Sequence, residues 1–266
     1  MNDRVALVTG AARGIGAATV LALAGAGWSV LAVDKAADDP ALPYPMATPA
    51  NLSGVVRRAG ERAGPGRVRS FVADVRDPDA VTAAVAEAEH RWGGLDAAVA
   101  AAGVIAGGVP LWEVPPAGQQ AVLDVNLGGV LSLARAAVPA LLRRPAPRSG
   151  RFLAVSSAAA TRGLPMLAAY SAAKAGVAGL IRALAAELAD SGVTANAVSP
   201  GSTATPILDE SARLYRLPGA EAFAGQQPAG RLLDPAEVAA VLAFLASPAS
   251  SGMTGAMVPV DGGLAL

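Results

Sequence analysis

A glycine-rich turn between an apolar strand-like run and an apolar helix-like run restricts the fold of this chain more than any other feature. Val5 to Val8 leads into Thr9-Gly10-Ala11-Ala12-Arg13-Gly14-Ile15-Gly16. Gly10 permits a tight turn after the strand, and Gly14 and Gly16 let the backbone and the helix approach a pyrophosphate closely. The start of the helix supplies free N–H groups and the positive end of a dipole. The pattern predicts a strand–turn–helix unit that binds the phosphates of a dinucleotide.

The rest of the chain repeats this alternation of short apolar runs and longer helical segments. The other expected strands are Ser29 to Val33, Val68 to Val72, Ala97 to Ala100, Phe152 to Val155, Thr194 to Val198 and Ala256 to Val260. The expected helices are Gly14 to Ala26, Leu52 to Ala63, Pro78 to Trp92, Gly118 to Leu142, Ala168 to Ala189 and Pro235 to Ser247. Such alternation builds a parallel sheet with helices on both faces. We predict one doubly wound α/β domain over residues 1–266.

Two stretches interrupt the alternation. One spans residues 35–51 and carries four prolines, and the other spans residues 202–232 before the last long helix. Loops of this length inside a compact domain are usually functional. We expect the first to lie near the cofactor and the second to cover the substrate, with a tolerated surface insertion as the alternative for the first.

Composition excludes several other classes of site. The 21 basic and 21 acidic residues balance, which gives no reason to expect a nucleic-acid or membrane partner. With no cysteine and only His90, we predict no disulfide, no cysteine nucleophile and no metal site, and a cytoplasmic location. His90 follows a helical run and is expected on the helix surface. The first apolar run is too short for a signal peptide or a membrane span.

An acidic residue at the end of the second strand points to the kind of dinucleotide. Asp34 lies 18 residues after Gly16, where a carboxylate can accept hydrogen bonds from ribose hydroxyls and repel a 2′-phosphate. This favours NAD, although the nearby Lys35 and Arg13 leave NADP open. Asp74, after the third strand, is expected either to face the adenine or to cap the helix that begins near Pro78.

A tyrosine and a lysine four residues apart are the candidate catalytic pair. Tyr170 and Lys174 share one face of a helix, just after a strand that ends in Ser156-Ser157. A cation beside a tyrosine favours the phenolate and lowers the pKa of the hydroxyl, as a positively charged oxidised nicotinamide would also do. Tyr170 would then take the proton of an alcohol as hydride leaves carbon, or return it in reduction, while Ser157 holds the substrate oxygen.

Taken together, these pieces resemble the short-chain dehydrogenase/reductase family over essentially the whole chain. The matching elements are Thr9 to Gly16, Asp74-Val75, Ala101-Ala102-Gly103, Asn126, Ser157, Tyr170, Lys174 and Pro200-Gly201. The resemblance implies a seven-stranded doubly wound sheet and hydride transfer to or from a nicotinamide.

The resemblance also implies roles for individual residues. The catalytic tetrad falls on Asn126, Ser157, Tyr170 and Lys174, with Asn126 holding a water that joins the lysine to a proton relay. The cofactor positions are Gly10, Arg13, Gly14, Ile15, Gly16, Asp34, Asp74, Val75, Ala101, Ala102, Gly103, Tyr170, Lys174, Pro200, Gly201, Thr203 and Thr205. Thr203 and Thr205 belong to a strand expected after Pro200-Gly201, which would meet the carboxamide. Ala101 stands where the family usually has asparagine, and its absence is expected to cost one hydrogen bond but not the reaction.

A narrower resemblance concerns the proline-rich insertion. Leu42-Pro43-Tyr44-Pro45-Met46-Ala47-Thr48-Pro49-Ala50-Asn51-Leu52 is similar to the extra segment of the mycofactocin-coupled, carveol dehydrogenase-like branch. In that branch the segment covers the NAD, which is held and reoxidised by a mycofactocin redox carrier. The alternatives are an ordinary reductase that exchanges NAD or NADP and, from another class, a nucleotide-binding regulator without catalysis.

The substrate pocket is expected to be apolar. Its predicted walls are Val104 to Trp112, Leu164 to Met166 and the 203–228 segment, whose charged residues Asp209, Glu210, Arg213 and Arg216 would sit in a mobile loop. We predict a small, neutral, fairly apolar alcohol or ketone as substrate. Relatives form tetramers through the helices around Asn126 and after Tyr170 and through the glycine-rich C-terminus, so we predict a homotetramer.

Overall fold

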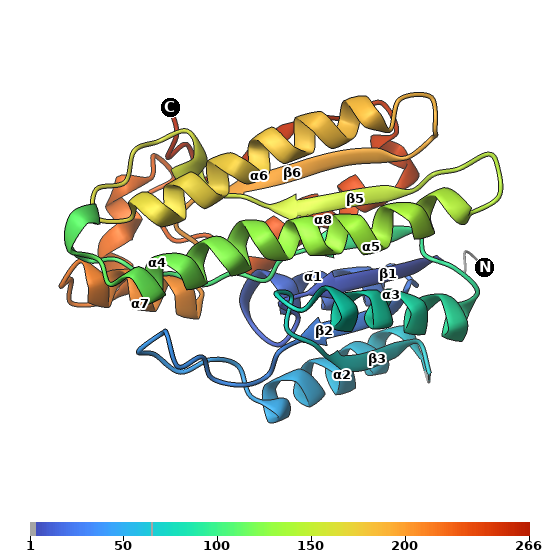
Figure 1. Cartoon of the computed structure of the whole chain (residues 1–266), viewed down its shortest axis with the longest axis horizontal. Coiled ribbons are helices and arrows are strands. Elements are labelled where there is room, and N and C mark those ends of the chain that lie inside the picture. The colour runs from blue at the N-terminus through green and yellow to red at the C-terminus, as the bar shows by residue number, and fades with distance from the viewer. Residues whose placement is uncertain (1–3, 65) are drawn as a thin grey trace.

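One parallel sheet of seven strands forms the centre of the structure, a computed structural model that describes residues 4–64 and 66–266 (Figure 1). The strands are β1 Val5–Thr9, β2 Ser29–Asp34, β3 Val68–Val72, β4 Ala97–Ala100, β5 Arg151–Val155, β6 Thr194–Pro200 and β7 Met257–Val260. Their order is β3-β2-β1-β4-β5-β6-β7, and all neighbours are parallel. The predicted doubly wound sheet is confirmed, with strand ends shifted by up to two residues.

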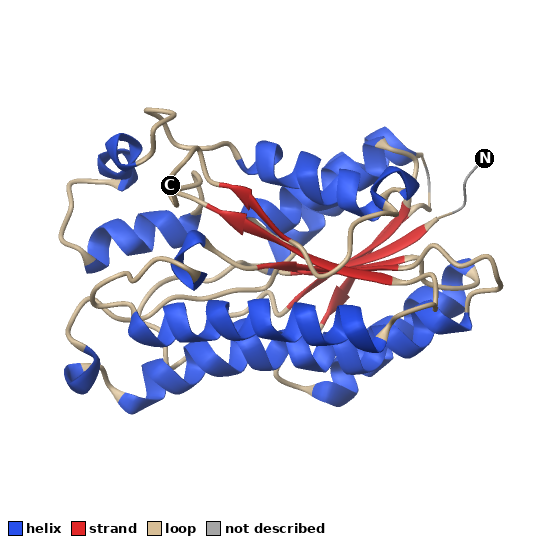
Figure 2. Cartoon of the chain, turned by 90° about the horizontal axis from the view of Figure 1, so that it is seen from above, coloured by secondary structure: helices blue, strands red, loops and turns tan. Residues whose placement is uncertain are grey.

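Helices cover both faces of the sheet, as Figure 2 shows from above. The helices α3 Pro78–Trp92, α5 Gly129–Arg143 and α6 Ala168–Glu187 pack on one face, and α1 Gly14–Gly25, α2 Pro49–Ala63 and α8 Pro235–Ala246 pack on the other. Strands β1, β4 and β5 are buried at every residue, because both of their faces are covered. Thin Ala, Val and Leu side chains suit strands between two helical layers.

The two irregular stretches contain more helix than the sequence suggested. Helix α2 begins at Pro49, inside the expected insertion, because the Thr48 side chain accepts a hydrogen bond from the N–H of Asn51 and the Asn51 side chain accepts one from the N–H of Thr48. The 202–232 segment is not a long loop. It holds α7 Pro206–Leu214, capped by Thr205, and a short 3₁₀ helix at Ala220–Gln226. The strand expected after Pro200-Gly201 is reduced to one bridge between Thr203 and Leu233.

The long central helix contains a change of pitch at the site. Helix α4 Pro116–Leu123 continues through a π-helical turn, Asp124–Gly128, into α5. The sequence predicted one regular helix here. The π turn carries the buried Asn126, and such turns are frequent at functional sites. By length and hydropathy this 28-residue helix would be able to cross a membrane, but half of its apolar window is buried inside the fold.

The order of the strands places the site. The chain leaves β1 in one direction along the sheet and β4 in the other, so a crevice opens between the carboxyl ends of these two strands. Gly10 follows β1 and lies against the backbone of Ala102 after β4, where a Cβ on Gly10 would come within 2.6 Å of it. Ser157 follows β5 and Gly201 follows β6 at the same edge.

Candidate active site

A cavity of about 650 Å³ runs along the carboxyl edge of the sheet. Every residue predicted to bind the cofactor lines it, from Gly10 to Thr205, and so does Ser157. Among the residues predicted to be catalytic or to bind the cofactor, Asn126 alone does not line the cavity. The sequence motifs, separated by up to 195 positions along the chain, therefore meet in one place.

The turn after β1 has the shape that a pyrophosphate requires. Gly10 and Gly14 have left-handed backbones, with φ of 65° and 56°, and a Cβ on Gly16 would collide with the carbonyl oxygen of Gly10. Arg13, at the start of α1, makes no side-chain cap hydrogen bond. The first N–H groups of α1 thus remain available for an anion. The residues of this turn fit the diphosphate of a nicotinamide dinucleotide.

The carboxylate of Asp34 organises the adenosine end. It accepts hydrogen bonds from the N–H groups of Ala12, at 3.0 Å, and Ala36, at 2.9 Å. Asp74 forms a two-pronged ion pair with Arg76, at 2.6 Å. Burial opposes ionisation of Asp74, but hydrogen bonds from Arg76 outweigh it and lower the pKa of this carboxyl. The alternative role for Asp74 as a helix cap is wrong, because Asp77 caps α3.

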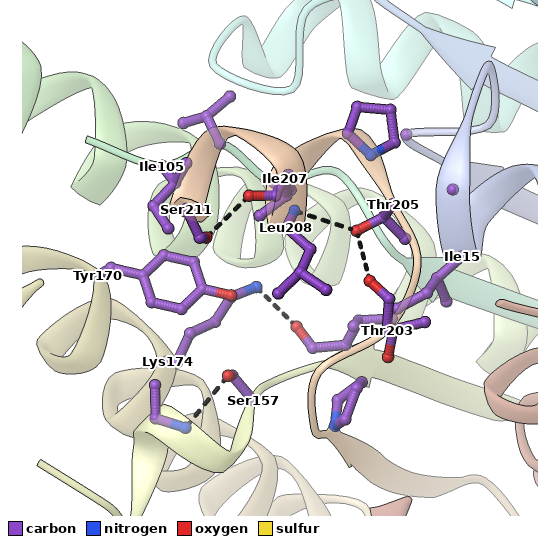
Figure 3. Close-up of a pocket in the computed structure, with 18 of the residues that line it drawn as sticks. Ile15, Ile105, Ser157, Tyr170, Lys174, Thr203, Thr205, Ile207, Leu208 and Ser211 are labelled. Atoms are coloured by element: carbon purple, nitrogen blue, oxygen red, sulfur yellow. Dashed lines mark hydrogen bonds between the residues drawn. The ribbon is translucent and has the colours of Figure 1, made fainter. Parts of the chain in front are cut away.

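Three of the four side chains of the predicted catalytic tetrad, those of Ser157, Tyr170 and Lys174, lie near one another in the cavity, as Figure 3 shows. The Nζ of Lys174 lies 5.7 Å from the centre of the Tyr170 ring and donates to the carbonyl of Val155 at 2.8 Å. The Oγ of Ser157 accepts from the N–H of Ala159 at 3.1 Å, so the hydroxyl proton of Ser157 is directed elsewhere and can be donated. Helix α6 and the segment after β5 thus bring a phenol, an amine and a hydroxyl group close together.

The pKa values of the pair differ from the expectation. Burial raises the pKa of Tyr170, although hydrogen bonding from Ser157 opposes this. Burial lowers the pKa of Lys174 to about 8, because its side chain is only 4% exposed. The lysine alone therefore does not lower the pKa of the tyrosine, since removal from water outweighs the attraction. A second positive charge in the cavity would shift the balance toward the phenolate.

Asn126 hydrogen-bonds the backbone of the loop after β4, beside the cavity. Its side chain is fully buried, and its amide donates to the carbonyl of Val104 at 2.8 Å and accepts from the N–H of Val104 at 2.9 Å. Thr9 secures the same segment, because its hydroxyl accepts from the N–H of Ala101 at 3.2 Å. The loop after β4 is thus fixed from two sides without the asparagine that the family usually has at position 101.

The substrate end is apolar, but its walls differ in part from the prediction. Ile105, Leu164, Pro165, Ile207, Leu208 and Tyr215 line it as expected. Leu111 and Trp112 do not, because they lie on a short surface turn and are 47% and 84% exposed. Met166 does not line it either, and its carbonyl instead accepts from the N–H of Gly108. Leu217, Phe223 and Gln226 line the cavity within the predicted 203–228 wall. Arg162 and Leu264 also line it, and the sequence did not predict them.

The charged residues of the 202–232 segment do not face the cavity. Asp209, Glu210 and Arg213 lie on α7, and Arg216 follows it, but none of the four lines the cavity wall. Glu210 is nearly buried and pairs with Arg213 at 2.5 Å. The apolar side of α7 lines the site. The sequence was expected to form a loop here, so the amphipathic pattern of this helix was not recognised.

The proline-rich segment crosses the cofactor end of the cavity. We call residues 35–48 the strap. On one side Arg13, from the turn after β1, donates to the carbonyl of Pro45 at 2.9 Å and contacts the sulfur of Met46. On the other side the hydroxyl of Tyr44 accepts from the N–H of Ile105 at 2.9 Å. Burial raises the pKa of Tyr44 to about 12, so its hydroxyl stays protonated at neutral pH.

Comparison with known proteins agrees with this geometry. A family profile described as enoyl-(acyl carrier protein) reductase matches residues 10–265. The chain is 41% identical to the cis-4-hydroxycyclohexanecarboxylate dehydrogenase of Sinomonas cyclohexanicum, over 98% of this chain and 96% of the relative. It is also 41% identical to the short-chain reductase protein NovJ of Streptomyces niveus, over 98% and 94%.

A solved structure is similar over nearly its whole length. The carveol dehydrogenase of Mycobacterium avium, in complex with NAD, superposes with a TM-score of 0.91 at 34% identity and covers 98% of this chain and 97% of that chain. The doubly wound fold agrees with this structural match. This chain belongs to the short-chain dehydrogenase/reductase family, and the relatives named here are one reductase and two dehydrogenases.

Proposed function

We propose that this protein moves a hydride between NAD and a secondary alcohol or its ketone, with Tyr170 as the general acid and base. The observation that carries the proposal is the meeting of Tyr170, Lys174 and Ser157 in the cavity that also contains the glycine turn and Asp34. NAD, when bound, supplies the carbon that accepts or gives the hydride. A regulator without catalysis would not need all three polar side chains at one point.

The residues of the chain handle the proton. In oxidation the substrate hydroxyl loses its proton to the phenolate of Tyr170, and in reduction the Tyr170 hydroxyl returns it. The Ser157 hydroxyl donates a hydrogen bond to the substrate oxygen and fixes its position. The ammonium of Lys174 favours the phenolate and is held near it by the carbonyl of Val155.

The substrate we propose is a small cyclic alcohol or ketone with a largely apolar body. The substrate end is walled by Ile105, Leu164, Pro165, Ile207 and Phe223, which offer apolar surface with few polar groups. Two of the matched proteins are named for cyclic alcohols, a hydroxycyclohexanecarboxylate and carveol. Efficient turnover of a sugar phosphate, with none of apolar cyclic alcohols, would contradict this.

We further propose that NAD is retained between turnovers and reoxidised by a mycofactocin-type carrier. The support is the strap, which joins the turn after β1 through Arg13 to the loop after β4 through Tyr44. A covering segment fixed at both sides slows dissociation, and differences in affinity appear mainly in off-rates. The alternative is a reductase that exchanges NAD or NADP freely, and the rate at which bound NAD leaves separates the two.

A cytoplasmic homotetramer is the assembly we propose. The helix from Pro116 to Arg143 is apolar, yet only half of its most apolar window is buried in one chain. Leu131 on this helix is 48% exposed. A second copy of the chain would cover this apolar side chain. Light scattering measures the assembly directly, and a mass of one chain would contradict it.

Replacement of the tyrosine tests the chemistry. In Tyr170→Phe the rate of hydride transfer to NAD from a cyclic secondary alcohol should fall by about a hundredfold to ten-thousandfold, while NAD stays bound. The matched control is Ser171→Ala, since the Ser171 hydroxyl is the next on α6, has no hydrogen-bond partner among the described residues and does not line the cavity. Full activity in Tyr170→Phe, measured by stopped-flow absorbance of NADH, would overturn the proposal.

A further inference from the structure

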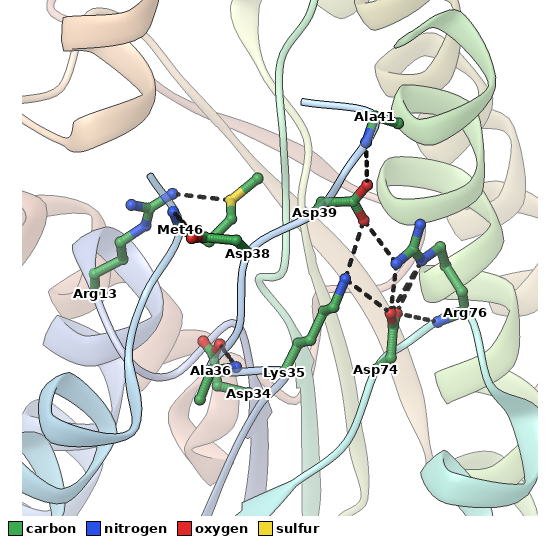
Figure 4. A network of polar contacts seen from close by, with 10 residues as sticks. All are labelled: Arg13, Asp34, Lys35, Ala36, Asp38, Asp39, Ala41, Met46, Asp74 and Arg76. Carbon is green, nitrogen blue, oxygen red and sulfur yellow. Dashed lines mark hydrogen bonds and ion pairs between the residues drawn. The ribbon is translucent and has the colours of Figure 1, made fainter. Parts of the chain in front are cut away.

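Four charged side chains form a compact cluster at the adenosine end of the cavity. We call Lys35, Asp39, Asp74 and Arg76 the charge cluster (Figure 4). Asp39 pairs with Lys35 at 3.0 Å and with Arg76 at 2.7 Å. Asp74 pairs with Arg76 at 2.6 Å and with Lys35 at 3.6 Å. All four side chains line the cavity, so the cluster is part of the nucleotide site.

Within the part of the chain that the structure describes, each cation at this end already has a partner. Lys35 and Arg76 each contact both carboxylates, and Arg13 is directed to the strap, where it donates to Pro45. A 2′-phosphate needs a cation near the adenosine ribose. Three cations therefore lie close to this region, yet all three are engaged.

The strap supplies one of the two carboxylates. Asp39 is only 6% exposed and accepts a hydrogen bond from the N–H of Ala41 at 3.0 Å. Burial opposes its ionisation, but this hydrogen bond and the contacts with Lys35 and Arg76 prevail and lower its pKa. Asp39 is thus a buried, charged group held in place by the strap and directed at two cations.

We propose that Asp39 is a second determinant of the preference for NAD over NADP, acting by occupying Lys35 and Arg76. This rests on the proposed use of NAD. Asp34 repels a 2′-phosphate directly, whereas Asp39 withholds the cations that would otherwise bind one. The strap then sets which nucleotide enters as well as how slowly it leaves.

The number of charges in the cluster gives the direction in which loss of the Asp39 charge changes the nucleotide preference. With Asp39, two carboxylates balance two cations in the cluster. Without its charge, Asp74 alone faces Lys35 and Arg76, and one cation is free to meet a phosphate. Because Asp34 remains, the preference for NAD should weaken without a complete reversal. One charge-assisted hydrogen bond corresponds to about a tenfold to hundredfold change in relative affinity.

The test removes the charge of Asp39 and keeps the shape of its side chain. Asp39→Asn retains an oxygen that accepts from Ala41. Nucleotide-depleted protein is titrated with NADH and with NADPH, and the ratio of the two Kd values is read from nicotinamide fluorescence. We expect the ratio to shift toward NADPH by about tenfold to a hundredfold. Asp39→Ser, which also keeps an oxygen near Ala41, should shift it in the same direction and guards against misfolding of the first variant.

Two further variants test whether the shift depends on the freed cation and on the position of the lost charge. Asp39→Asn combined with Arg76→Gln removes a freed cation and should abolish most of the shift. Asp79→Asn removes an equal charge from an exposed position on the first turn of α3 and should change the ratio less than twofold.

The outcomes also separate this inference from the proposed function. If Asp39→Asn and Asp39→Ser shift the ratio no more than Asp79→Asn does, Asp39 is not a determinant. Oxidation of an alcohol with NAD would then still proceed through Tyr170. A wild-type protein that binds neither nucleotide would instead overturn the proposed function.

Discussion

At the scale of single residues, the protonation state of the reacting group depends on burial as much as on neighbouring charge. Tyr170 and Lys174 lie together, but removal from water raises the pKa of the tyrosine and lowers that of the lysine. Each group in the free protein is therefore biased toward its neutral form. The positive nicotinamide ring of NAD would restore the missing attraction, so the acid–base pair should be set for catalysis only when the nucleotide is bound.

The buried lysine predicts a pH dependence of stability. The pKa of Lys174 is about 8 in the folded chain, against 10.5 for an exposed lysine. Between these values the unfolded chain binds a proton that the folded chain has lost, so the free energy of unfolding rises with pH. Lys174→Met lacks this contribution. Across that range the wild type should gain up to about 3 kcal/mol relative to the variant.

Urea unfolding of both nucleotide-free proteins at several pH values from 7 to about 10.5 measures this difference. Comparison at equal pH cancels the titration of the other groups. A difference that stays constant, or that moves in favour of Lys174→Met as pH rises, would contradict the burial of an ionisable lysine at this position.

Residues within short motifs could be predicted from the sequence, and residues that act through distant contacts could not. Gly10, Ser157 and Tyr170 lie where their local patterns place them. Tyr44 and Asp39 gain their roles from Ile105 and Arg76, which are 61 and 37 positions away. Composition and spacing do not indicate such partners, because the fold alone brings them together.

At the scale of elements, the strap covers the cofactor end of the site. It leaves the sheet after β2, and in Figure 1 it extends toward the end of the molecule where α4 and α7 lie. Leu42 and Tyr44 pack with Val104, Val125 and Tyr170 in one apolar cluster. The strap is therefore a packed element and not an open loop.

Removal of one hydroxyl should loosen the strap. Tyr44→Phe keeps the packed ring but deletes the acceptor for the N–H of Ile105. Loss of such a bond should speed release of bound NADH by about twofold to tenfold. Tyr215→Phe is the matched control, because its hydroxyl donates to Pro165 at the substrate end. Displacement of NADH by excess NAD, followed by fluorescence, measures both, and equal release rates in Tyr44→Phe and wild type would argue against a latch.

The elements themselves were predicted unevenly. Buried strands and long helices follow from apolar runs of the right length, and all seven strands of the sheet were found. Helix α7 was missed because its polar residues, Asp209, Glu210 and Arg213, suggested a solvent-exposed loop. The π turn around Asn126 was missed because poor helix formers such as Asn126 and Gly128 do not by themselves indicate a change of pitch, and the partner of Asn126, Val104, is 22 positions away.

At the scale of the whole molecule, the sheet order explains why one cavity serves both nucleotide and substrate. The β1–β4 reversal opens the crevice, and the strap and α7 cover its two ends. The adenosine end is charged, with three carboxylates and three cations in its lining, and the substrate end is apolar. Cofactor and substrate thus have separate environments that meet at Tyr170.

The central claim is that NAD is a retained partner of Tyr170, and a single-turnover experiment tests it most directly. Protein as purified, with no NAD added, is mixed with carveol or another cyclic secondary alcohol, and NADH is followed by absorbance, with an acid extract to count bound nucleotide. We predict up to one NADH per chain, followed by a stop that added NAD does not relieve. Protein that arrives empty, or that turns over steadily once free NAD is supplied, would contradict the claim.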